Sequence, residues 1–173
     1  MTSLLTKKIA VSGVLAALGL ILAQIFHIFS LSGAIFLPLH VPALLCGLIC
    51  GWGFGGAVGV LTVALASFTT GMPPVYPVGV LMAVELAAYG AAAGLLRKKV
   101  NVYIALIAAM LAGRIVYGIA SPIVLGLDGR DFEFVGFLTG SFVTALPGII
   151  IQIALIPPIV IALRKSGVLR GLL

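Results

Sequence analysis

Apolar residues occur in six long runs, separated by short stretches that are polar or rich in glycine and proline. Runs of about 20 apolar residues are long enough to cross a bilayer as helices. The pattern therefore predicts an all-α membrane protein, a single integral membrane domain over residues 1–173 with six transmembrane helices in one bundle. The expected spans are residues 8–29, 40–51, 56–69, 78–96, 102–124 and 135–165.

Two of these runs have unusual lengths. The second is short, unless the loop before it also enters the membrane. The sixth has nearly 30 residues, more than the ~20 that a span needs, so we expect it to tilt or bend. Pro147 is the expected hinge, because proline removes a helical hydrogen bond and clashes with the preceding turn.

Composition supports the membrane class: 62% of the residues are hydrophobic, 8% are charged, and the mean hydropathy is +1.34. The net charge of +6 does not indicate nucleic-acid binding, because the basic residues lie at the ends of apolar runs. Under the positive-inside rule they place both termini in the cytoplasm. These residues are Lys7, Lys8, Arg97, Lys98, Lys99, Arg164, Lys165 and Arg170. The opposite face receives the loops near 30–38, 71–77 and 128–133, with Asp128 in the last.

The chain shows no motif for catalysis, a cofactor or a metal ion. Residues 51–56 match G-x-G-x-x-G, but they join two membrane spans and lack the strand that a dinucleotide site requires. We interpret them as a tight turn that allows close packing. Cys46 and Cys50 are predicted to be buried packing residues. His27 and His40 have no cysteine or carboxylate neighbours in sequence, so they are expected to be interfacial or hydrogen-bonded residues rather than metal ligands.

Glu85 and Arg114 are the charged residues that lie clearly inside predicted spans. At 1.5 Å per residue, Glu85 lies roughly 10 Å and Arg114 roughly 15 Å from the outer ends of their helices. A charge at such depth is costly and usually faces a partner or a cavity. Two interpretations stay open: an ion pair that locks spans 4 and 5 together, or a polar site offered to a ligand.

The neighbours of the two charges favour a small-molecule site. Tyr89 follows Glu85 by four residues and Tyr117 follows Arg114 by three, so each shares a helix face with its charge. Ser121 extends the second face outward. Tyr76 lies in the turn above, which also contains Thr69 and Thr70. A few fixed polar groups among aromatic rings are typical of ligand pockets.

Several segments resemble one family of transport proteins. A basic N-terminus leads into IAVSGVLAAL at 9–18, followed by HVPALLCGLICG at 40–51, GAVGVL at 56–61, GMPP at 71–74 and ELAAYG at 85–90. Over essentially the whole chain, this resembles the S component, the substrate-binding subunit, of an energy-coupling factor (ECF) vitamin transporter.

The resemblance implies that a transmembrane scaffold subunit and two cytoplasmic ATPases drive toppling of this subunit in a bacterial cell membrane. It implies docking through a small-residue strip on helix 1, here Gly13 and Ala17. It also implies vitamin binding near the outer face, at positions that match by location: Tyr76, Glu85, Tyr89, Arg114, Tyr117 and Ser121. The subunit would be neither an enzyme nor a cofactor carrier.

Two other functions were weighed: a structural six-span protein of the MreD type, and a small channel or ion exchanger. The vitamin is not identified by the sequence. No large outer aromatic stack suited to a flavin is evident, which favours a smaller ligand such as pantothenate, a pyridoxine-like ring or a thiamin precursor. Folate, riboflavin and a queuosine precursor stay open.

Overall fold

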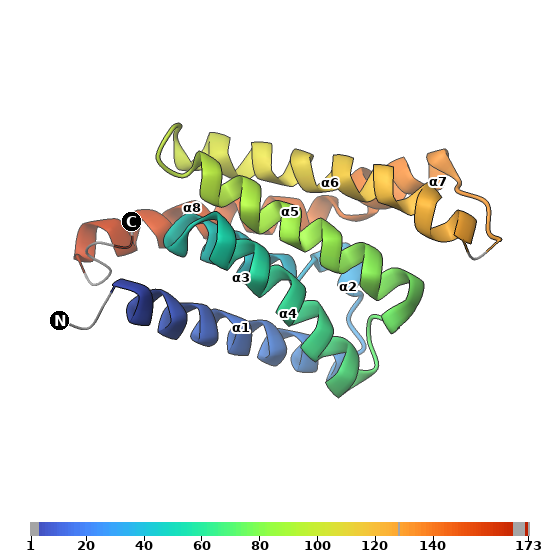
Figure 1. Cartoon of the computed structure of the whole chain (residues 1–173), viewed down its shortest axis with the longest axis horizontal. Coiled ribbons are helices and arrows are strands. Elements are labelled where there is room, and N and C mark those ends of the chain that lie inside the picture. Colours follow the sequence, from blue (N-terminus) through green and yellow to red (C-terminus); the bar gives the residue numbers. More distant parts are fainter. Residues whose placement is uncertain (1–3, 128, 168–171, 173) are drawn as a thin grey trace.

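A computed structural model of the protein describes residues 4–127, 129–167 and 172 (Figure 1). These residues form helices and connecting turns, and no strand occurs among them. The elements are α1 (Leu4–Ile28), α2 (Gly33–Phe36), α3 (His40–Cys50), α4 (Trp52–Thr70), the π-helical η1 (Val75–Gly79), α5 (Val80–Leu96), α6 (Val102–Leu127), α7 (Phe134–Leu138), the π-helical η2 (Thr139–Thr144) and α8 (Leu146–Ser166).

The six predicted spans are confirmed, with changes at the second and the sixth. Six segments of the described residues are long and apolar enough to cross a membrane: 4–28, 33–50, 52–70, 75–96, 102–127 and 146–166. The second span includes α2 and α3, joined by a break at Leu37, which has a left-handed backbone (φ 53°). The segment before α3 is therefore part of the second span. This explains why the apolar run predicted for that span was too short to cross the membrane by itself.

The sixth apolar run does not form one long helix. It is divided into α7, η2 and α8, and α8 begins at Leu146, one residue before Pro147. Proline cannot donate the backbone hydrogen bond that would continue the preceding helix. The predicted bend therefore occurs, and residues 134–144 form a separate short apolar segment.

One end of the bundle, which we call the basic end, carries Lys7, Lys8, Arg97, Lys98, Lys99, Arg164 and Lys165. Cys50 Sγ contacts the Lys8 carbonyl, so the start of α1 lies beside the end of α3. Arg164 donates to the Arg97 carbonyl, so the ends of α5 and α8 also meet. The start of α1 and the end of α8 both lie at this end (Figure 1). Asp128 and Arg170 lie outside the described residues. We call the opposite end, which carries η1 and α7, the cavity end.

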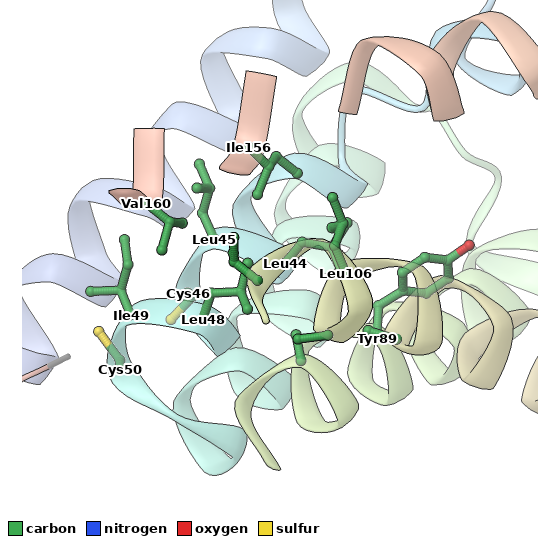
Figure 2. Packing of buried hydrophobic residues seen from close by; sticks show 14 of the residues in the cluster. Leu44, Leu45, Cys46, Leu48, Ile49, Cys50, Tyr89, Leu106, Ile156 and Val160 are labelled. Carbon is green, nitrogen blue, oxygen red and sulfur yellow. The ribbon is translucent and has the colours of Figure 1, made fainter. Parts of the chain in front are cut away.

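Helix α3 forms the centre of the bundle. Ten of its eleven residues are buried, and its leucines pack against α5, α6 and α8 through Tyr89, Leu106 and Ile156 (Figure 2). Cys46 and Cys50 are free thiols within this core, as their spacing predicted. The other helices expose large apolar side chains on their outer faces, as expected for surfaces that contact lipid.

Glycines bring α3, α4 and α5 into backbone contact. A Cβ atom at Gly55 would collide with the backbone of Gly47 and with the Gly90 carbonyl, and one at Gly90 would collide with Gly55. Small residues permit such close approach between membrane helices. Gly51 joins α3 to α4 with a φ of 104°, which L side chains rarely adopt. The interpretation of the G-x-G-x-x-G stretch as a turn and close-packing device is confirmed.

Candidate functional site

A cavity of about 800 Å³ occupies the cavity end of the bundle. This volume lies within the range of known small-molecule sites. Its wall comes from α1, α2, α3, α5, α6, α7 and η2, from Thr70 of α4 and Val78 of η1, and from the connecting segments at 29–32, 37–39 and 71–74. Polar side chains on this wall are His27, Ser30, Ser32, His40, Thr70, Glu85, Arg114, Tyr117 and Ser141.

Glu85 and Arg114 form a buried ion pair on the cavity wall. Glu85 Oε1 lies 2.8 Å from Arg114 Nη1, and the two side chains are 3% and 10% exposed. Glu85 comes from the second turn of α5 and Arg114 from the middle of α6, so the pair links two adjacent helices. The two interpretations of these charges are therefore compatible, because the residues pair with each other and also line the cavity.

The ion pair leaves part of Arg114 without a partner. Its Nε and Nη2 atoms are buried and have no hydrogen-bond partner among the described residues. Buried donors of this kind are costly, so each such group in a native structure calls for an explanation such as water or a ligand. Arg114 is thus both fixed by Glu85 and able to donate further hydrogen bonds.

His40 is a lining residue that sequence reasoning did not select. It is 1% exposed, and its Nε2 lies 3.9 Å from Glu85 Oε2, too far for a hydrogen bond. Neither ring nitrogen has a hydrogen-bond partner among the described residues. The expectation that His40 is interfacial or hydrogen-bonded is not met among the described residues, because the ring is buried and both its nitrogens lack a partner. The break at Leu37 places it at the first position of α3, inside the bundle, and no local sequence pattern reveals that break.

Tyr117 belongs to an aromatic wall on one side of the cavity. Its ring stacks on Phe137 of α7, with centroids 5.9 Å apart and planes 8° from parallel. Phe132 and Phe134 pack around Phe137. Gly118 provides the space, because a Cβ atom there would lie 2.9 Å from the Phe137 ring. Sequence reasoning found no large outer aromatic stack suited to a flavin and overlooked this smaller wall, for which the phenylalanines at 132, 134 and 137 were the available signal.

Three other predicted site residues do not line the cavity. Tyr76 is exposed, and its hydroxyl donates to the Val124 carbonyl, which ties η1 to the end of α6. Tyr89 lies in the core, with its ring edge-on to His40 at 5.1 Å. The Ser121 hydroxyl donates to the Tyr117 carbonyl within α6. Tyr89 and Ser121 were selected because each shares a helix face with Glu85 or Arg114. A shared face does not by itself bring a side chain to the cavity.

The break between α2 and α3 is held from α8. Gln152 donates its side-chain amide to the Leu37 carbonyl at 3.2 Å, and both residues are buried. Gly148 allows this approach, because a Cβ atom there would lie 2.7 Å from the backbone of Ile35 and Phe36. Since a lipid environment offers no water to an interrupted helix, its freed carbonyl needs such a partner. Gln152 therefore helps to fix one wall of the cavity.

The small residues of α1 divide between two faces. Ser12, Gly19 and Ala23 face the bundle and are buried, and Gly19 contacts Thr62 of α4. Gly13 and Ala17 are exposed, and nothing lies within 4 Å of the space that a Cβ atom at Gly13 would fill. The structure therefore assigns the first strip to packing within the chain and leaves the second uncovered.

The lining residues provide no metal centre. Among residues 4–127, 129–167 and 172, no group of three or more His, Cys, Asp or Glu side chains is arranged to hold a metal ion. The cavity instead combines a charge pair, unpartnered donors and aromatic rings, which suits hydrogen bonding to an organic molecule.

Comparison with known proteins gives one match. Residues 7–160 match the family described as "ECF transporter, substrate-specific component". The matched region includes the complete cavity wall and the exposed strip of α1. No curated protein and no solved structure matches the chain.

Proposed function

Because the chain belongs to the family of ECF transporter substrate-specific components, we propose that its cavity captures a small vitamin or vitamin precursor for import. The observation that carries this proposal is a cavity of ligand size with a buried ion pair and unpartnered donors on its wall. A subunit of this family is a multi-pass protein of the bacterial cell membrane that associates with other transporter subunits. Family membership argues against the MreD-type and channel interpretations.

Glu85, Arg114 and Tyr117 are proposed to contact the ligand, together with His40. Tyr76 and Ser121 are proposed to act indirectly: Tyr76 ties η1 to α6, and Ser121 bonds the Tyr117 backbone. Tyr89 is proposed to support the His40 ring, which its own ring contacts edge-on. The basic end is proposed to face the cytoplasm, because positively charged loop ends are retained on that side. The cavity would then open toward the exterior.

Energy for import is proposed to come from partners, namely a membrane scaffold subunit and two cytoplasmic ATPases. Gly13 and Ala17 are the proposed docking positions on α1. They form an exposed strip of small side chains, which would let a partner helix approach closely. Both residues are exposed in the described part of the chain, so the strip is available to a second protein.

The test separates capture from transport. Native mass spectrometry of the purified chain should show a retained vitamin, and cells that also contain an ECF scaffold and its ATPases should accumulate that vitamin. Ala17→Leu should reduce uptake by at least about tenfold while the purified variant still retains ligand. Val14→Leu, at an exposed neighbouring position, is the matched control and should leave uptake unchanged. A purified protein without bound ligand would contradict vitamin capture. Uptake by the Ala17→Leu variant equal to that of wild type would contradict docking through this strip.

A further inference from the structure

The charges around the cavity restrict the ligands that it can bind. Among the described lining residues, the Asp, Glu, Lys and Arg side chains are Glu85 and Arg114 alone. They neutralise each other at 2.8 Å, so the wall has no net charge apart from its histidines. A buried charge is stable only when it is paired. The positive charge of Arg114 is therefore already compensated before a ligand enters.

The unpartnered atoms of Arg114 define a geometry. Nε and Nη2 lie on the same side of the guanidinium group, so their N–H bonds form one of its two-donor edges. This edge matches a flat group that presents two neighbouring acceptors. A carboxylate satisfies that requirement, and so does a neutral heteroaromatic or amide edge, such as a carbonyl oxygen beside a ring nitrogen.

Charge decides between these two chemistries. A ligand carboxylate on the free edge would place two negative groups around one guanidinium whose side chain is only 10% exposed. Glu85 would repel that carboxylate across the guanidinium group, and this repulsion would offset part of the attraction that Arg114 offers. The ligand would still lose its hydration. A neutral acceptor pair keeps both hydrogen bonds without adding charge.

The aromatic wall supports the same choice. The stacked rings of Tyr117 and Phe137 both line the cavity. Aromatic rings pair well with other flat rings in offset or edge-on arrangements. A planar ligand would therefore contact this wall while its acceptor edge reaches Arg114.

Resting on the proposed vitamin capture, we infer that the ligand is an uncharged planar compound, a neutral heteroaromatic molecule with two adjacent acceptors, and that Glu85 excludes its carboxylate analogues. Glu85 is thus a specificity residue as well as the partner of Arg114. This selects the uncharged members of the vitamin group over pantothenate and folate, which carry carboxylates.

Matched ligand pairs test the inference on the purified full-length chain. The probes are nicotinamide and nicotinate, and pyridoxine and 4-pyridoxate, with riboflavin and folate as larger neutral and anionic ligands. Calorimetry gives the dissociation constant of each. We expect the chain to bind the neutral member of at least one pair, or riboflavin over folate, at least tenfold more tightly than its anionic counterpart.

Variants then identify the residue that sets this ratio. Glu85→Gln should shift the neutral-to-anionic ratio at least tenfold toward the carboxylate, because Arg114 then has an uncompensated charge. Glu133→Gln removes the same charge from the loop outside the cavity lining and should leave the ratio unchanged. Arg114→Lys keeps the charge but loses the two-donor edge, and should weaken neutral binding at least tenfold.

The outcomes separate vitamin capture from the inferred preference for an uncharged ligand. Preference for a carboxylate in the wild-type chain would overturn the inference while leaving vitamin capture intact. An unchanged ratio in a folded Glu85→Gln variant would do the same. If Glu85→Gln does not fold, the wild-type ratio and Arg114→Lys decide. Absence of binding by every probe would overturn the inference, and a purified chain that is also empty in native mass spectrometry would reject vitamin capture at this cavity.

Discussion

Removing Arg114 alone should destabilise the protein more than removing the whole ion pair. At a separation of 2.8 Å, two unit charges in an effective dielectric of about 20 attract each other by ~6 kcal/mol. Burial costs each ion several kcal/mol, so the intact pair contributes little net stability. Arg114→Met leaves the Glu85 carboxylate buried without its partner, which should cost about 3–5 kcal/mol.

The double variant Glu85→Leu/Arg114→Met should recover most of that loss, because two apolar side chains of similar size replace the pair. Thermal unfolding in detergent measures the difference. For a chain of this length, about 2–4 °C per kcal/mol predicts a fall of roughly 6–20 °C for Arg114→Met. A single variant as stable as wild type would refute the reasoning, and so would a double variant that is less stable than either single variant. Loss of ligand binding in the double variant, with its fold retained, would separate the two roles of the pair.

Three further predictions follow from contacts outside the pair. Gly90→Ala should lower stability by more than about 2 kcal/mol, since its new methyl group would meet the backbone of α4, whereas Gly53→Ala, with open space around it, should be neutral in the same unfolding assay. Gln152→Leu should cost about 1–3 kcal/mol in thermal unfolding by leaving the carbonyl at the α2–α3 break unpaired, and an unchanged melting temperature would contradict that role. Tyr117→Ala should weaken ligand binding at least tenfold by calorimetry, whereas Tyr76→Phe should change it less than about threefold, because that side chain lies outside the cavity. Equal losses in the two tyrosine variants would contradict the observed wall.

The span positions were predictable because hydropathy and the length of a bilayer-crossing helix are local properties of the sequence. The interruptions within the second and sixth apolar runs were only partly predictable. Pro147 signalled the bend before α8, since proline has a fixed local effect. The left-handed backbone at Leu37 carries no such signal, because leucine rarely adopts it. That break depends on Gln152, a residue more than a hundred positions away.

The candidate site was predictable where burying a charge in the membrane costs so much free energy that the charge needs a partner or a cavity. Charges inside membrane helices need partners, and this requirement placed Glu85 and Arg114 correctly on a cavity wall. Depth along a helix was harder to judge. Tyr89 shares a face with Glu85 but lies one turn nearer the core, where Gly113 provides space for its ring. His40 was missed because its burial depends on the fold of the preceding break.

The glycine contacts among α3, α4 and α5 have a mechanical consequence for any transport cycle. Where helices meet backbone to backbone, no layer of side chains lies between them that could rearrange. We therefore expect these three helices to move as one rigid unit. Glu85 and His40 both belong to that unit, so we expect their mutual spacing to be kept. Widening of the cavity would then have to come from the other parts of its wall, among them the interrupted segments at 33–39 and 134–145.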